Sequence, residues 1–484
     1  MKRPFLGPIA ALVVFAAALC CQPVKADWLP NLLAPEDEAK MGAEQAPEVT
    51  KQFGGVYENP ELARYVTSIG QLLASTVEEP NVHYTFTILN SPIVNAFSLP
   101  GGYVYVTRGL LALADDEAEL AGVMAHELGH INAHHSAQRY SRTVFAQLGL
   151  GLLGAVTKSD IAGQLGGTAA QLVLMSYSRD QEFEADSRGV RYMSRAGFDP
   201  HAMAGFLSKL QANDALQAQI AGHPGAADKF NLLATHPRTA DRVERAISEA
   251  GGIAVKEPVV ARDIYLRKLD GLVYGDDPDQ GIVRGQKFIH PKLRFAFEVP
   301  AGFSLINSAD AVVALGPQNA RIEFDLVGGA AGVPVMNYLT GVWAKGVQLR
   351  DVETLNINNM QAATGWARLT RQGETVDVRP VAISFDRESI ARLFFEFPSS
   401  MGDQLQDGLK KTTYSFRRLA AGEAEHVSHD RLRIVTVGSG DTVQSLSARQ
   451  PFENYSEQRF RVLNGLGPSD GVNPGTLVKV VTSE

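Results

Sequence analysis

The segment VMAHELGHINAHH, from Val123 to His135, places two histidines four residues apart within an apolar stretch. On an α-helix, residues separated by four positions project from the same face, so His126 and His130 can bind one ion together. Two imidazoles so placed, with a glutamate directly after the first, form the pattern of a zinc hydrolase. The apolar neighbours predict a buried helix, and buried imidazoles need polar partners, which a metal ion would supply.

The start of this helix is also marked in the sequence. Asp116 followed by Glu119 is a capping-box pattern, which predicts that the helix begins just before ELAGVMAHELGH. Glu127 lies beside the two histidines, where it could take a proton from a zinc-activated water. A chance occurrence of this short pattern on a surface helix is the alternative, and the apolar neighbours disfavour it.

A catalytic zinc needs a third protein ligand and one open position. Ala133 and Ser136 stand where the metzincin pattern requires glycine and histidine, so that class is excluded. Further on, SYSRDQEFEADSRG places Glu182 and Asp186 four residues apart on a second predicted helix. Glu182 could ligate the zinc, and Asp186 could orient a ligating histidine. Glu184 is a competing ligand that points off this face, and a solvated charged helix face is the alternative.

The N-terminal segment predicts export. Lys2 and Arg3 precede the short apolar run IAALVVFAAAL, and VKA precedes Asp27, which indicates a signal peptide over residues 1–26. A retained anchor is the alternative, although the run is short for a membrane span. Both cysteines fall within this segment, so the mature chain would have no disulfide. We expect a periplasmic protein and leave membrane association open.

The chain of 484 residues is too long for one ordinary core, and its patterning changes along its length. Helix signals dominate residues 27–255, whereas LRFAFEVP, RIEFDLV and RLFFEF alternate with period 2 within residues 264–418. Residues 419–431 are typical of a linker, and residues 432–484 predict a small αβ module. The predicted fold class is therefore multidomain α+β: a mainly helical domain with a small sheet, a sheet-rich α+β domain of unknown role, and the small module.

Four motifs follow one another in the first domain: NAFSLPGGYVYVTRGLL, EAELAGVMAHELGHINAHH, SRDQEFEAD and ATHPRTADR. Over about residues 35–250 the chain resembles the gluzincin zinc metallopeptidase family of the CAAX prenyl proteases and HtpX. The absence of membrane spans points to its soluble periplasmic, BepA-like branch. The resemblance implies one Zn²⁺ per chain bound by His126, His130 and Glu182. It also implies that Glu127 is the general base and that Asp186 supports a ligand.

The last motif adds two candidate catalytic residues, His236 and Arg242, which match residues that line the family's active site. A histidine at this point can occupy the open zinc position and hold the enzyme latent, and either residue could stabilise the oxyanion. An ordinary loop histidine before Pro237 is the alternative for His236. His135 also matches a family histidine, although a packed helix residue is the simpler interpretation, and His134 has no predicted role.

The resemblance extends to how the chain would bind its partners. The strand Tyr103 to Val106 resembles the edge strand to which family substrates add, although its tyrosines could merely pack the sheet. GDTVQSLSAR, FRVLNGL and VNPGTLVKVV, within Arg433 to Val481, resemble a LysM module, which binds glycans of the N-acetylglucosamine type. A docking module without sugar affinity is the alternative.

Together these features predict a zinc-dependent endopeptidase that cleaves misfolded or unassembled envelope proteins. Peptidoglycan is an expected partner of the C-terminal module, and peripheral contact with the outer membrane or its assembly machinery stays open. The net charge of −8 and the lack of a long basic run argue against nucleic acid. One alternative is a chaperone or cell-wall-binding scaffold with vestigial proteolysis, which the intact zinc and base residues disfavour. A zinc hydrolase that acts on the cell wall itself is another.

Overall fold

The structure is a computed structural model of the chain. The predicted signal peptide, both cysteines and Arg242 lie outside the residues it describes. Within the described part of the chain, no helix combines the length and apolar character needed to cross a membrane. The structure describes residues 34–79, 81–139, 177–221, 232, 236, 244, 246–248, 255–308, 311–329, 332–371 and 374–484.

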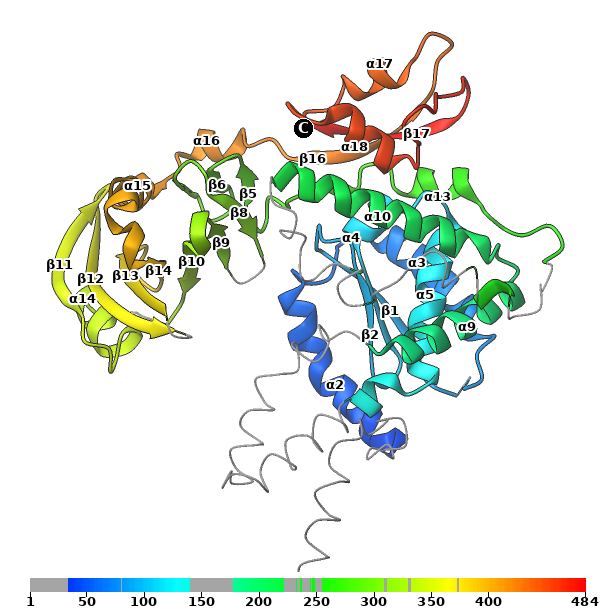
Figure 1. Cartoon of the computed structure of the whole chain (residues 1–484), viewed down its shortest axis with the longest axis horizontal. Helices are drawn as coiled ribbons and strands as arrows, with labels where there is room; N and C mark the ends of the chain where they lie inside the picture. The colour runs from blue at the N-terminus through cyan, green and yellow to red at the C-terminus, as the bar shows by residue number, and fades with distance from the viewer. Residues whose placement is uncertain are drawn as a thin grey trace, which may run out of the picture.

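The first part of the chain is mainly helical and surrounds a small sheet, as the sequence predicted (Figure 1). Its helices are α2 (Pro35–Gln52), α3 (Pro60–Ala74), α4 (Arg108–Leu113), α5 (Glu117–Asn132), α9 (Arg179–Ala196), α10 (His201–Ala221) and α13 (Arg262–Lys268). Its strands are β1 (Thr85–Leu89), β2 (Ala96–Leu99) and β3 (Tyr103–Thr107).

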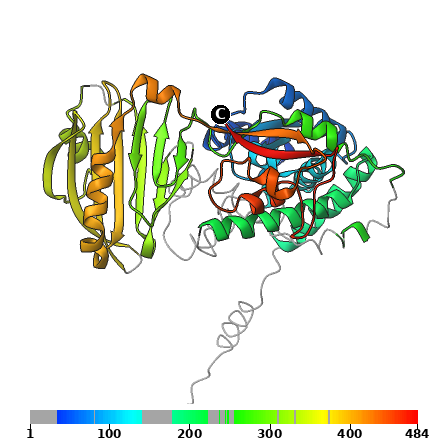
Figure 2. The same cartoon turned by 90° about the horizontal axis from the view of Figure 1, so that it is seen from above.

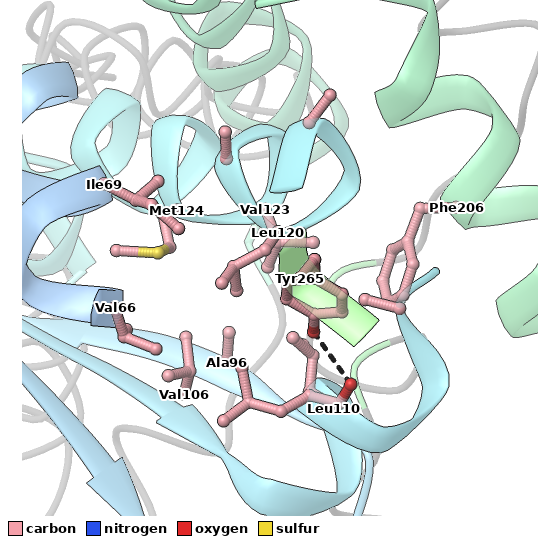
Figure 3. Packing of buried hydrophobic residues seen from close by; sticks show 14 of the residues in the cluster. Val66, Ile69, Ala96, Val106, Leu110, Leu120, Val123, Met124, Phe206 and Tyr265 are labelled. Carbon is pink, nitrogen blue, oxygen red and sulfur yellow. Dashed lines mark hydrogen bonds between the residues drawn. The ribbon is translucent and has the colours of Figure 1, made fainter. Parts of the chain in front are cut away.

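The two-histidine segment lies on α5, which begins where the capping pattern predicted. The Asp116 side chain accepts a hydrogen bond from the Glu119 backbone N–H at 2.8 Å. Leu120 and Met124 of α5 pack into the main apolar cluster, where Val66 of α3 and Tyr265 of α13 also lie (Figure 3). Nearly every side chain of α5 is buried, so this helix is the centre of the domain.

The small sheet corrects one sequence-based expectation. Its strand order is β1-β3-β2, so the strand Tyr103 to Val106 is central and the prediction that it forms the edge is wrong. β3 pairs in parallel with β1 and antiparallel with β2. The strong strand-forming sequence YVYV identified a strand, but local propensity does not determine its neighbours. The edge strand next to α5 is β2, whose side chains are all buried.

Two glycines allow α5 and α9 to pack closely. A Cβ atom on Gly129 of α5 would lie 2.7 Å from the backbone oxygen of Ala185 on α9. A Cβ atom on Gly189 of α9 would lie 3.2 Å from the backbone nitrogen of His126. Since the predicted ligands lie on both helices, this close approach determines the distances between them.

The middle of the chain forms a separate, sheet-rich domain with α15 packed on it (Figures 1 and 2). An antiparallel sheet has the strand order β11-β12-β13-β14-β10-β9-β8, and a second sheet has the order β15-β7-β6-β5. These two sheets confirm the sheet-rich domain that the alternation of apolar residues with period 2 predicted. The elements are β5 (Ile282–Arg284), β6 (Lys287–His290), β7 (Phe295–Glu298), β8 (Ser304–Asn307), β9 (Val312–Leu315), β10 (Arg321–Val327), α14 (Val335–Tyr338), η3 (Leu339–Trp343), β11 (Arg350–Ile357), β12 (Met360–Arg371), β13 (Glu374–Ser384), β14 (Ile390–Pro398), α15 (Gly402–Ser415) and β15 (Arg417–Arg418).

The C-terminal module is a small αβ unit, as predicted, and it consists of two strands and two short helices. A short helix, α16 (Ala421–Glu425), lies within the predicted linker. The module's own elements are β16 (Asp430–Thr436), α17 (Val443–Ser447), α18 (Ser456–Leu463) and β17 (Leu477–Ser483). β16 pairs with β17 on one side and with β4 (Val273–Tyr274) on the other. The pairing with β4 joins the module to the segment that follows α13 of the first domain.

This module shares the core of the helical domain. Four of its apolar side chains belong to the same buried cluster as α5: Leu432, Leu463, Leu477 and Val481. Lys479 is fully buried, and its Nζ donates to three successive carbonyls at the end of α4, those of Ala112 at 2.9 Å, Leu113 at 3.0 Å and Ala114 at 2.8 Å. Its Nζ also lies 2.8 Å from Asp115. The sheet-rich domain is therefore an insertion between two segments that build one core.

Candidate metal centre

Four side chains from separate parts of the chain converge beside α5. They are His126 and His130 of α5, Glu182 of α9, and His236, and all are at most 1% exposed. One potential ligand atom from each lies within 4.8 Å of the others. His126 Nε2 lies 2.9 Å from His130 Nε2 and 3.7 Å from a Glu182 oxygen, and His130 Nε2 lies 3.4 Å from the other Glu182 oxygen.

These distances and donor types fit zinc. Zinc bonds of about 2.0–2.2 Å in a tetrahedron place the ligand atoms roughly 3.3–3.6 Å apart. The three distances among His126, His130 and Glu182 lie close to that range. Two imidazoles and one carboxylate are also a ligand set of catalytic zinc sites. The arrangement thus supports the ligands that the sequence suggested.

Asp186 contacts one of the candidate ligands directly. Its Oδ1 lies 2.8 Å from His126 Nδ1, and both side chains are fully buried. A carboxylate at this distance keeps the ring proton on Nδ1 and leaves the Nε2 lone pair to face the cluster. Glu182 and Asp186 point to the cluster together because they lie one helical turn apart on α9.

Glu127, the predicted general base, is fully buried next to the ligand cluster. Ser98 of β2 donates a hydrogen bond from its Oγ to Glu127 Oε2 at 3.0 Å. Glu127 Oε1 lies 3.5 Å from His236 Nε2. The sequence reasoning missed Ser98, since a serine within NAFSLPGG has no spacing that relates it to α5.

The structure places His236 within the ligand cluster. Its Nδ1 lies 2.9 Å from Glu182 Oε1 and 3.3 Å from His126 Nε2. Its backbone N–H donates to the Leu232 carbonyl, and the Leu232 N–H donates to the Val94 carbonyl just before β2. The other predicted residue of this motif, Arg242, lies outside the described residues.

Burial and mutual contacts determine the charges of the candidate ligands. Burial lowers the pKa of His130 well below its usual value. Burial acts to raise the pKa of Glu182, but His236 and His130 outweigh it, and the pKa lies well below the usual carboxyl range. A neutral imidazole and an ionised carboxylate are the forms that bind metal ions.

The remaining candidates lie around His130. Tyr177 stacks on its ring with 3.8 Å between the ring centroids. His135 Nδ1 lies 2.9 Å from His130 Nδ1, on the side of the ring away from the cluster. Glu184, the competing ligand, faces His135 at 3.4 Å and is not among the convergent groups. His134 bridges Glu38 and Glu79, and it is not part of the cluster that the described residues form.

Comparison with known families identifies the two ends of this architecture. Residues 60–250 match the model of peptidase family M48, and residues 435–481 match that of the LysM domain. The chain carries an M48 peptidase domain and a LysM domain. The predicted resemblance, the LysM module and the multidomain α+β fold class are therefore confirmed.

Several curated proteins are similar to part of the chain. A beta-barrel assembly-enhancing protease of Yersinia pestis is 28% identical over 288 residues, 56% of either chain. The protein of that name from Escherichia coli K12 is 31% identical over 221 residues, 43% of either chain. Mitochondrial metalloendopeptidase OMA1 of Schizosaccharomyces pombe is 30% identical over 215 residues, which cover 43% of this chain and 59% of that one. The chain thus spans about half the length of these relatives.

Solved structures add no argument about function. A cyanobacterial PsbP from Synechocystis matches 30% of this chain and 98% of its own, with 12% identity and a TM-score of 0.22. At that score the likeness supports no conclusion about this chain.

Proposed function

We propose that the chain is a zinc-dependent endopeptidase that cleaves misfolded or unassembled envelope proteins. The convergence of His126, His130 and Glu182 beside the carboxylate of Glu127 is the observation that carries the proposal. The M48 match and the names of the similar proteins, a beta-barrel assembly-enhancing protease and a metalloendopeptidase, support it.

The chain's own residues supply the acid–base chemistry. One zinc ion held by His126, His130 and Glu182 would polarise the scissile carbonyl and lower the pKa of water to about 7. Glu127 accepts the proton of the attacking water on Oε1, because Ser98 already engages Oε2. The same carboxyl group then donates this proton to the leaving amine, which restores the base.

His236 keeps the site latent in this arrangement. Its Nδ1 lies in the ligand cluster while its Nε2 faces Glu127, so one ring blocks both the open metal position and the general base. Substrate can enter only after this ring moves. In the open enzyme, His236 or Arg242 stabilises the oxyanion, a role that for Arg242 rests on the family resemblance.

The edge of β2 is the surface that would bind the substrate. The Asn95 carbonyl accepts a hydrogen bond from Thr107 of β3, so the peptide groups of Ala96 and Ser98 point to the other side. An extended substrate that pairs with β2 would lie beside Glu127, because Ser98 belongs to β2 and donates a hydrogen bond to Glu127. Pairing of this kind reads the backbone rather than the side chains, which suits unfolded proteins.

The cellular setting follows from the remaining features. The predicted signal peptide supports a location in the periplasm. The LysM domain supports binding to peptidoglycan, which would hold the protease near the cell wall. Contact with the outer membrane or its assembly machinery fits the names of the similar bacterial proteins.

Cleavage of reduced, unfolded casein by the mature chain tests the proposal, with Glu127→Gln and a zinc chelator as controls. The wild type should cut, whereas the variant and the chelated protein should not. His236→Ala should cut faster than the wild type if this histidine holds the site closed. If the wild type and His236→Ala both bind zinc fully and neither cleaves casein, the scaffold function is favoured and the endopeptidase is refuted.

A further inference from the structure

The two histidine ligands of α5 are supported in different ways. His126 faces a buried carboxylate, that of Asp186, at 2.8 Å. His130 faces a second imidazole instead, with 2.9 Å between its Nδ1 and that of His135. A buried ring N–H without an acceptor costs free energy, so the identity of this neighbour matters for the ligand.

The contact between the two rings determines where their protons lie. His130 points Nε2 at the ligand cluster, so this nitrogen must be unprotonated to bind a metal ion. Its proton therefore lies on Nδ1 and is donated to His135. Because His135 accepts on its own Nδ1, the proton of that ring must lie on Nε2.

The His135 Nε2–H in turn has a matched acceptor. Glu184 Oε2 lies 3.4 Å from it, at the outer limit of a hydrogen bond. Arg188 holds the other carboxylate oxygen, Oε1, with Nη2 at 2.9 Å and Nε at 3.1 Å. Each oxygen of Glu184 thus has one partner, and the carboxylate is held with Oε2 facing His135.

We propose that His135 is a positioning residue for the metal centre, which fixes the tautomer and the ring orientation of His130 and is itself oriented by Glu184. This inference rests on the proposed function only through the identity of the zinc ligands. The contacts run from His130, which is fully buried, through the ring of His135, which is 1% exposed, to the carboxylate of Glu184, which is 47% exposed.

The competing explanation is that His135 only fills space. Its ring meets that of His130 edge to face, with 5.0 Å between the centroids, so packing is part of the contact. Packing and hydrogen bonding can be separated, because the Oδ1 atom of asparagine occupies nearly the same place as Nδ1 of histidine. Phenylalanine keeps the ring and removes the acceptor.

The test is the zinc affinity of the full mature chain, measured by competition with a chromogenic chelator. His135→Phe should weaken zinc binding by about 10- to 100-fold, the usual loss when a partner of a metal ligand is removed. His135→Asn should bind zinc nearly as tightly as the wild type. Glu184→Ala should show a smaller loss than His135→Phe, because the contact is long and half exposed.

His134→Phe is the matched control, since the side chain of this neighbouring histidine lies on Glu38 and Glu79 and its loss should leave zinc affinity unchanged. Equal affinity of folded His135→Phe and the wild type would overturn the proposal. Equal losses in His135→Asn and His135→Phe would also overturn it, because the acceptor that asparagine keeps would then make no difference to zinc binding. If the wild type and His236→Ala both bind zinc and neither cleaves casein, the proposed function is refuted while this test stays intact.

Discussion

Substitution of Gly129 by alanine tests whether the close packing of α5 on α9 builds the metal centre. The new Cβ atom would lie 2.7 Å from the Ala185 carbonyl oxygen and 3.0 Å from its Cα atom. Both are backbone atoms, so no side chain can rotate to relieve the contact. An ordinary contact begins at 3.4 Å, so the helices must separate locally by about 0.7 Å.

This shift is large for a metal site. A functional constellation tolerates displacements of about 0.5 Å. His126 and His130 would move away from Glu182, and we expect zinc affinity to fall by at least about 10-fold. The effect on stability is smaller, because overpacking costs about 1–3 kcal/mol while replacing a helical glycine by alanine returns about 1 kcal/mol. The metal-free protein should therefore lose about 0–2 kcal/mol of unfolding free energy.

The matched control is Gly205→Ala on α10, where a Cβ atom would meet nothing within 4 Å. That variant should gain up to about 1 kcal/mol and bind zinc normally. Chelator competition gives the zinc affinity, and urea unfolding of the metal-free proteins gives the stability. If Gly129→Ala binds zinc as tightly as the control, the helix contact does not determine the ligand geometry and the reasoning fails.

Three further outcomes follow from other contacts in the structure. Lys479→Met removes the buried donor to the end of α4 and should lower the unfolding free energy by about 3 kcal/mol, measured in urea; a loss below about 0.5 kcal/mol would contradict a structural role. Glu38 raises the pKa of His134 to about 9. The stabilising contribution of protonated His134 is therefore full below pH about 6.5 and disappears as the pH rises through about 9. His134→Gln should flatten the dependence of unfolding free energy on pH over that interval in the metal-free protein. His126→Ala should abolish zinc retention, and metal analysis showing a full zinc load would refute its assignment as a ligand.

The residues of the metal centre were open to sequence reasoning because their spacing is local. His126 and His130 share a helical face whatever surrounds them, and the same holds for Glu182 and Asp186. His236 was different, since nothing local ties it to α5. Only the family resemblance suggested its place near the metal.

Other features depend on contacts that no local pattern contains. The central place of β3 results from pairing with two partners, which strand propensity does not specify. Lys479 lies in strand β17, and a lysine side chain would be expected in solvent, yet it is buried against α4. The contact between His135 and Glu184 joins two helices, so the spacing within either one gave no signal.

The burial of Lys479 also has a consequence for the time at which the chain can finish folding. Its bond to the Ala112 carbonyl spans 367 positions in the sequence. At a synthesis rate of about 5–20 residues per second, its two ends are produced roughly 20 to 70 s apart. During that interval the carbonyls at the end of α4 lack their donor, and the cluster around α5 lacks the apolar side chains of β16, α18 and β17. The helix that carries His126 and Glu127 therefore gains part of its stabilising contacts from a segment that is synthesised much later. A competent peptidase domain is delayed until synthesis has reached the LysM domain.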